Sequence, residues 1–154
     1  MRRAPLLLLL AACGGEPEPA PTTGGASFAF SASNTVRRSR ALVDPLIGMV
    51  YGEVFRVEEV TVTGPIAGAM DFGGYTPVRV DLRTSSTTAD LARVEGLPTG
   101  RLVFLGFWDL DGNSTADDRR PDPGDPATLP TVNEFLVKPG LVTPVTISFD
   151  IVLN

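Results

Sequence analysis

The 154-residue sequence contains no histidine, a single cysteine (Cys13) and a single lysine (Lys138). The lack of histidine excludes Ser-His-Asp and Cys-His catalysis, and also any histidine-ligated zinc, iron or copper site. One cysteine cannot form an internal disulfide or a cysteine-cluster metal site. The formal net charge of −5 argues against nucleic acid as a partner, because nucleic acid binds to basic surfaces. These absences leave few catalytic mechanisms open.

Long apolar runs are also missing, and the short run near the N-terminus has the pattern of a signal peptide. Arg2 and Arg3 provide a charged start, residues 6–10 are all leucine, and two small residues, Ala11 and Ala12, follow. The apolar run is far shorter than the roughly 20 residues that cross a bilayer. We therefore expect residues 1–12 to be a cleaved signal peptide.

The segment Leu10-Ala11-Ala12-Cys13 resembles the lipobox of bacterial lipoproteins in all four positions. The resemblance implies cleavage before Cys13, lipidation of Cys13, and anchoring of the mature chain in a membrane through its acyl chains. The residue after the cysteine is Gly14 and not the aspartate that retains enteric lipoproteins in the inner membrane. By that resemblance, the expected location is the outer membrane of the cell envelope and not the inner membrane.

Cleavage would make the mature chain more acidic. It would remove two of the 13 basic residues and none of the 18 acidic ones, which changes the net charge to −7. Such a chain gains no attraction to anionic lipid, so its attachment would depend on the acyl chains themselves.

Composition divides the rest of the chain into a tether and one domain. Residues 13–26 are rich in proline, glycine and threonine and have no apolar pattern, which predicts a lipidated N-terminus that continues as a disordered tether. Residues 27–154 are long enough to build one core without disulfides. Glycine and proline together number 30, which favours short strands joined by turns over long helices.

Short apolar alternations predict an all-β domain. The continuous apolar run at 102–108 predicts a central strand that is buried on both faces. Near the C-terminus, the odd-numbered residues from Val145 to Leu153 are all apolar, which predicts one strand with these side chains on a single face. Further strands are predicted at residues 28–30, 49–57, 60–63, 78–83 and 133–137. The short segment 86–94 is the single helix prediction. This pattern favours an antiparallel β-sandwich.

The loop from Asp109 to Asp125 holds six of the 18 acidic residues. Alternate residues of a tight loop can direct oxygen atoms at one calcium ion, which is a hard cation that takes six to eight oxygen ligands. The candidate ligands follow the first odd positions of a calcium loop and are Asp109, Asp111, Asn113, the backbone carbonyl of Thr115, and Asp117. A further carboxylate ligand could come from Asp118, Asp122 or Asp125.

The same loop departs from an EF-hand. Ser114 and Arg120 occupy positions 6 and 12, where an EF-hand has glycine and glutamate, and a buried strand instead of a helix precedes the loop. Arg119 and Arg120 could also neutralise the acids directly in a metal-free turn. The sequence leaves both a calcium site and a salt-bridged loop open.

The segment from Gly96 to Asn113, together with residues 121–126, resembles the second half of transthyretin-like β-sandwich modules, also called carboxypeptidase regulatory-like domains. The shared features are a Leu-Pro-x-Gly turn, an aromatic-rich strand, an Asp-x-Asp-Gly-Asn loop and a Pro-Gly-Asp-Pro turn. The body also resembles small deltaproteobacterial lipoproteins at Tyr51-Gly52 and at the turn over residues 62–65. Modules of this kind are usually non-catalytic, and they bind, space or stabilise other components.

These observations predict a non-catalytic, membrane-anchored lipoprotein with a structural or partner-binding role in the envelope. No catalytic residue is predicted, because carboxylate-pair chemistry needs acids on both sides of a cleft and the acids here gather in one loop. Calcium is the one candidate cofactor. The expected partners are the membrane, through the lipid anchor, and an envelope protein or polysaccharide, with no nucleic acid.

The alternative is a carbohydrate- or peptide-binding module. Tyr51, Tyr75, Phe107 and Trp108 could then form an aromatic platform for the ligand. The competing expectation is that Phe107 and Trp108 pack in the core or at its rim, as large aromatic side chains commonly do.

Overall fold

The computed structural model describes residues 20–40, 46–73, 77–115 and 117–154. The expected signal peptide, Cys13 and Tyr75 therefore lie outside the described residues. Strands dominate this part of the chain, which confirms the all-β prediction. The elements in order are β1 (Thr23–Ala32), α1 (Asn34–Arg40), β2 (Ile47–Arg56), the 3-10 helix η1 (Val57–Glu59), β3 (Val60–Thr61), β4 (Gly64–Pro65), β5 (Val78–Asp81), β6 (Ala92–Pro98), β7 (Gly100–Asp109), β8 (Pro126–Ala127), β9 (Glu134–Val137), β10 (Val142–Phe149) and β11 (Ile151–Val152).

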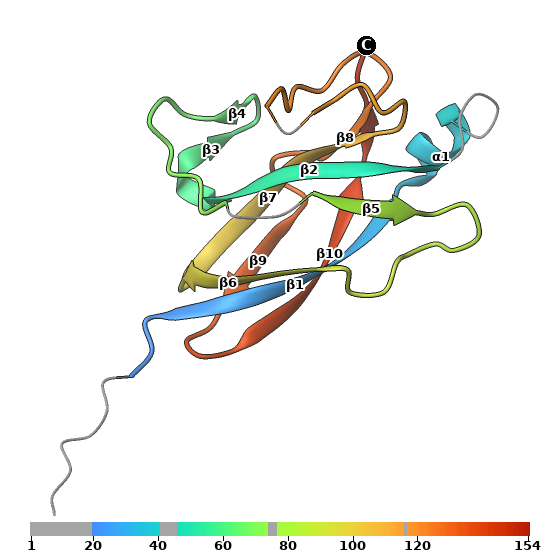
Figure 1. Ribbon diagram of the computed structural model, residues 1–154. Coiled ribbons are helices and arrows are strands. Elements are labelled where there is room, and N and C mark those ends of the chain that lie inside the picture. Colours follow the sequence, from blue (N-terminus) through green and yellow to red (C-terminus); the bar gives the residue numbers. More distant parts are fainter. Residues whose placement is uncertain (1–19, 41–45, 74–76, 116) are drawn as a thin grey trace, which may run out of the picture.

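The strands form three sheets, and the start of β1 and the C-terminus lie at opposite ends of the molecule (Figure 1). The smaller of the two main sheets has the order β10-β1-β6. The larger has the order β11-β8-β7-β2-β5, with β9 also paired to β7, while β3 and β4 form a separate hairpin. The antiparallel prediction fails for one pair, because β1 and β10 run parallel. The chain reaches β10 by crossing over from β9 of the other sheet, so no tight hairpin forces it antiparallel to β1.

One apolar core is shared by the two main sheets. Side chains from β1, β6 and β10 meet side chains from β2, β5, β7 and β9 in a single buried cluster. Phe28 of β1 lies 5.3 Å from Phe104 of β7 and 5.6 Å from Phe135 of β9, measured between ring centroids. Trp108 of β7 lies 5.5 Å from Phe149 of β10. Aromatic side chains of this size supply much of the apolar area that a small domain can bury.

Two glycines make room for the ring of Phe104. Gly52 of β2 and Gly106 of β7 are direct partners in the antiparallel pair. A Cβ atom on either glycine would come within 2.8 Å of Cε1 of Phe104. A larger residue at either position would therefore displace this ring from the centre of the core.

Strand β1 begins at Thr23, four residues before the predicted start of the domain at residue 27. Gly24, which was assigned to the tether, is a strand residue that passes close to its neighbours. A Cβ atom there would lie 2.8 Å from Cγ1 of Val137 and 2.9 Å from the carbonyl oxygen of Leu141. The glycines that suggested flexibility instead permit close packing.

The helix prediction for residues 86–94 is wrong. Thr88 pairs with β1 instead, since its Oγ1 accepts a hydrogen bond from the Phe30 N–H (2.8 Å) and its own N–H donates to the Phe30 carbonyl (2.9 Å). The segment ends in β6. The α-helix of the described chain is α1, where the hydroxyl of Ser33 accepts from the N–H of Val36 at 3.3 Å as an N-cap.

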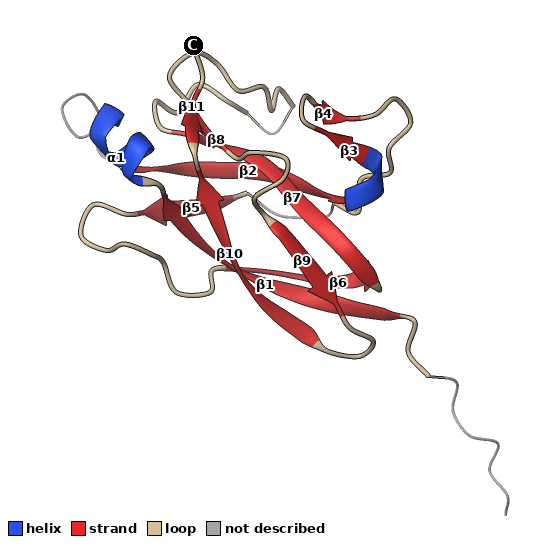
Figure 2. Cartoon of the chain, turned by 180° about the vertical axis from the view of Figure 1, so that it is seen from behind, coloured by secondary structure: helices blue, strands red, loops and turns tan. Residues whose placement is uncertain are grey.

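No helix in the described ranges combines the length and the apolar character needed to cross a bilayer. The helix α1 has seven residues and carries three arginines. Figure 2 shows α1 beside β11, at the edge of the strand-rich body.

The C-terminal segment does not keep its apolar residues on one face. Ile147 and Phe149 point into the core, as predicted. The strand is interrupted at Asp150, whose N–H donates to the Ala127 carbonyl at 3.0 Å. Beyond this break, Ile151 and Leu153 pack against Tyr51 and Phe107 on the other face of the larger sheet, in a second apolar cluster.

Asn133, just before β9, joins the two main sheets. Its side chain accepts from the Ser148 N–H (2.8 Å) and donates to the Ser148 carbonyl (3.0 Å), so it replaces a backbone partner for β10. Its own carbonyl accepts from the N–H of Phe104 at 3.1 Å. The residue is only 3% exposed, so water cannot easily substitute for the amide.

We predict that Asn133→Ala lowers the free energy of unfolding by about 2 kcal/mol, because it leaves the Ser148 N–H and carbonyl groups without their partner. Urea unfolding of the full chain measures this loss. The control is Asn154→Ala at the exposed C-terminus, which should change the stability little. Equal stability of the two variants would contradict the structural role of Asn133.

Candidate functional site

The acidic loop connects β7 to β8, and its two ends lie side by side. Asp109 is the last residue of β7, and Asp125 directly precedes β8. The antiparallel pairing of Phe107 with Ala127 brings these two ends together. Both aspartates are buried, at 1% and 2% exposure, which is unusual for carboxylates.

Three carboxylates converge at the base of this loop. Asp109, Asp111 and Asp125 each direct one oxygen into a group whose members lie within 4.8 Å of one another. Asp111 is exposed, so the group opens to solvent on that side. Carboxylate oxygens at such spacing repel one another unless a cation or protons compensate the charge.

The loop backbone holds Asp109 in place. Its Oδ1 accepts from the N–H of Gly112 at 2.7 Å, and its Oδ2 accepts from the N–H of Ser114 at 3.2 Å. Gly112 has a φ of 77°, a left-handed conformation that glycine adopts without strain. Asp111 similarly accepts from the N–H of Asn113 at 3.1 Å. The aspartates thus shape the turn that presents them.

Burial is the main cause that raises the pKa of Asp125 to about 6, and the negative charges of Asp122 and Asp109 contribute to the same rise. Hydrogen bonds from the N–H groups of Asp122 and Leu110 act in the opposite direction. The bond from the Asp122 N–H to Oδ2 of Asp125 measures 3.2 Å. A pKa near 6 means that this carboxyl group is destabilised as an anion in the folded chain.

Among the other predicted ligands, Asn113 lies nearest to the group. Its side-chain amide donates to Asp111 at 2.9 Å and also to Oδ2 of Asp122. The nitrogen of this amide, and not its oxygen, therefore faces the carboxylates. Asp122 is half-buried and contacts the group through Asn113 and through its own backbone N–H, which donates to Oδ2 of Asp125.

Thr115, Asp117 and Asp118 lie in the outer part of the loop and not in the three-carboxylate group. Thr115 and Asp118 close a turn of their own with two hydrogen bonds of 3.1 Å. Asp118 also pairs with Arg120 at 3.5 Å, but both side chains are largely exposed, and exposed pairs contribute little stability. The alternative in which an arginine neutralises the acids is thus seen at the tip of the loop, between Arg120 and Asp118, and not at its base.

A shallow hollow of about 200 Å³ adjoins Asp109 and Asp111. Gly48 of β2 and Arg79 of β5 also line it. A Cβ atom on Gly48 would approach the Asp109 carbonyl carbon to 2.9 Å, so glycine allows β2 to pass close to the end of β7. The hollow therefore gives access from the β2–β5 side of the sheet to the exposed Asp111, while Asp109 and Asp125 stay buried.

The aromatic residues divide between the two faces of the larger sheet. Trp108 is completely buried in the core, and Phe107 is 5% exposed, which confirms the expectation of core or rim packing. Phe107 stacks on Tyr51 on the opposite face, with centroids 5.3 Å apart and an interplanar angle of 19°. The continuous apolar run at 102–108 was the signal in the sequence that this second face is also covered.

Comparison with known proteins gives no assignment: no protein-family model, no curated protein and no solved structure matches this chain.

We predict that the stability of the full chain in the presence of a chelator falls as the pH rises through about 6. Asp125 binds its proton more tightly in the folded chain than in the unfolded chain, where its pKa is near 3.8. The stabilisation is therefore complete below about pH 4 and is lost above pH 6, by about 3 kcal/mol at most. No imidazole titrates in this range, because the chain lacks histidine. Urea unfolding between pH 4 and pH 8 measures the slope.

The Asp125→Asn variant should lose this slope and be more stable than the wild type at neutral pH. The exposed Asp117→Asn serves as the control and should keep it. An identical pH dependence in the wild type and Asp125→Asn would show that another group is responsible.

Proposed function

We propose that this chain is a non-catalytic lipoprotein of the bacterial cell envelope whose folded domain is stabilised by a calcium ion at the base of the β7–β8 loop. The observation that carries the proposal is the group formed by Asp109, Asp111 and Asp125, two of which are buried. Calcium would relieve the repulsion between these carboxylates and the desolvation of Asp125. Oxygens from the loop backbone or water would complete its six to eight ligands.

The charge of the cluster favours a cation over protons at neutral pH. A buried carboxylate that is neutralised only by protonation loses this compensation above its pKa of about 6. A hard divalent cation compensates the charge of several carboxylates at once, and this compensation is not lost when the pH rises above 6. The β7–β8 loop would then be a structural cation site that holds the two strand ends together.

We further propose that the two main sheets form a β-sandwich of the transthyretin-like kind. The support is the single core to which both sheets contribute. The sequence resemblance at residues 96–113 and 121–126 covers β7, the two ends of the acidic loop and the start of β8. In this reading, the domain is a rigid body that spaces, stabilises or binds other envelope components.

The membrane anchor rests on the lipobox resemblance at Leu10 to Cys13, with the outer membrane as the expected location. The absence of histidine supports a non-catalytic role, because it removes the commonest general base. The carbohydrate-binding alternative loses its largest aromatic side chain, since Trp108 is fully buried in the core.

We predict that calcium raises the melting temperature of the full chain by about 10 °C over the value in chelator. At about 100 times the dissociation constant, a ligand that binds only the folded state adds about 2.7 kcal/mol of stability. Asp111→Asn should lose most of this gain, because the exposed Asp111 contributes to the cluster without supporting the core. Differential scanning calorimetry measures both values.

The matched control for this experiment is Asp90→Asn, which removes an exposed carboxylate far along the chain from the loop and should keep the full calcium response. A melting temperature of the wild-type chain that does not respond to calcium would rule out the proposed cation site, and so would an equal response in the wild type and Asp111→Asn.

We predict that Cys13→Ala abolishes the incorporation of a radiolabelled fatty-acid precursor and releases the protein from the membrane fraction, because the anchor is attached through the sulfur atom. Ser27→Ala, after the expected tether, should leave labelling unchanged. Equal labelling of Cys13→Ala and the wild type would refute the lipoprotein assignment.

A further inference from the structure

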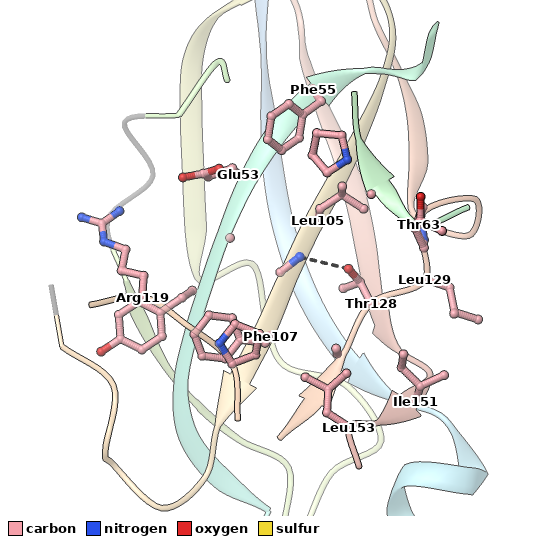
Figure 3. A pocket seen from close by; sticks show the side chains of 18 of the residues that line it. Glu53, Phe55, Thr63, Leu105, Phe107, Arg119, Thr128, Leu129, Ile151 and Leu153 are labelled. Carbon is pink, nitrogen blue, oxygen red and sulfur yellow. Dashed lines mark hydrogen bonds between the residues drawn. The ribbon is translucent and has the colours of Figure 1, made fainter. Parts of the chain in front are cut away.

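A groove of about 490 Å³ lies on the face of the larger sheet that points away from the core. The outward-facing side chains of β2 and β7 form its floor (Figure 3). Residues 62–65 of the β3–β4 hairpin, residues 127–130 and the C-terminal segment line its sides. This volume is within the range of sites for small ligands.

Most of the groove is apolar. Phe55, Leu105 and Phe107 line the floor, and Ile151 and Leu153 line the far wall. At its mouth stands Val62, whose side chain is 81% exposed. A valine this exposed at the rim of an apolar groove is available to cover an apolar ligand.

The charged side chains are confined to one side of the groove. Figure 3 shows Glu53 and Arg119 on the same side, while Leu129, Ile151 and Leu153 lie on the other. The groove therefore has a charged end, with one acid and one base, and an apolar end.

The electrostatics agree with this arrangement. Partial burial raises the pKa of Glu53, and the negative charge of Asp71 raises it further, while the positive charge of Arg119 lowers it. Glu53 and Arg119 are thus close enough to influence each other. Because partial burial disfavours the charged form of Glu53, a cation placed beside this carboxylate stabilises it.

The backbone of β7, which crosses the floor, has partners on both of its edges. β2 and β7 are paired with each other along residues 49–56 and 102–109. Gly106 also exchanges both of its hydrogen bonds with Thr128, at 2.9 Å each. An extended peptide would therefore find no free edge of β7 for β-augmentation here.

We propose that this groove binds a single-chain zwitterionic amphiphile, with its hydrocarbon chain along Leu105, Phe107 and Ile151, the cationic part of its head group at Glu53 and the anionic part at Arg119. The match is one of charge and of polarity: an acid and a base stand together at one end of a groove that is otherwise apolar. A sugar would find few polar groups along the walls. This site shares no lining residue with the proposed cation cluster.

The test uses the full chain carrying Cys13→Ala, so that no acyl chain of its own competes. The probe is dodecylphosphocholine, titrated below its micelle concentration and followed by isothermal titration calorimetry. We expect saturable binding to one site. Dodecyl maltoside, which has the same chain and an uncharged head, should bind at least about fivefold more weakly, and phosphocholine without a chain should show no detectable binding.

Variants locate the site. Glu53→Gln and Arg119→Gln should each weaken binding of dodecylphosphocholine by about two- to fivefold, since each removes one exposed charge contact. Val62→Asp should weaken it by at least about fivefold, because it puts an anion on the apolar wall. This position is exposed, so the variant should fold normally. The controls Val132→Asp and Arg93→Gln change an exposed valine and an exposed arginine outside the groove and should bind like the parent.

Three results would overturn the proposal. The first is no binding of dodecylphosphocholine below its micelle concentration. The second is equal affinity for dodecyl maltoside, which would mean that the charged pair is not used. The third is unchanged affinity in Glu53→Gln, Arg119→Gln and Val62→Asp, which would place any binding elsewhere on the chain.

Discussion

The antiparallel pairing of β2 with β7 is the interaction on which the rest of the structure depends. It joins Met49–Arg56 to Leu102–Asp109 without interruption. One face of this pair supplies Phe104 and Trp108 to the core, and the other supplies Tyr51 and Phe107 to the second apolar cluster. The end of β7 delivers Asp109 to the acidic loop. Because a strand alternates its side chains between two faces, any slip in this register would disturb all three regions together.

The acidic loop and the groove are neighbours as a result. The hydroxyl of Tyr51, whose ring helps to line the groove, donates to the Ser114 carbonyl of the loop at 3.3 Å. Arg119, from the same loop, lines the groove. The conformation of the loop base therefore influences where the positive charge of Arg119 lies at the rim of the groove. A rigid loop base keeps the arginine in position at a lower entropic cost than a free loop would.

Sequence periodicity located the strands well where side-chain burial sets the apolar pattern. Examples are the continuous apolar run of β7 and the alternation of β10. Periodicity failed where backbone partners decide the structure. The segment around Thr88 has residues compatible with a helix, yet its backbone pairs with Phe30 of β1. The acidic loop was identified from spacing, but Asp125 joins Asp109 and Asp111 through the hairpin and not through local sequence. The turn of the β3–β4 hairpin was visible in the sequence, but no local pattern reveals that this hairpin lines a groove on β2 and β7.

The parallel pairing of β1 with β10 has a consequence for how the chain folds. Phe28 and Phe30 meet Val145 and Ile147 across this pair, so the first strand of the domain obtains this partner only when the last part of the chain has been made. Contacts between residues so distant in sequence close slowly, because the entropy of a long loop must be lost before they form. β1 therefore cannot complete its pairing until β10 has been synthesised, and the smaller sheet is completed late in the folding of the domain.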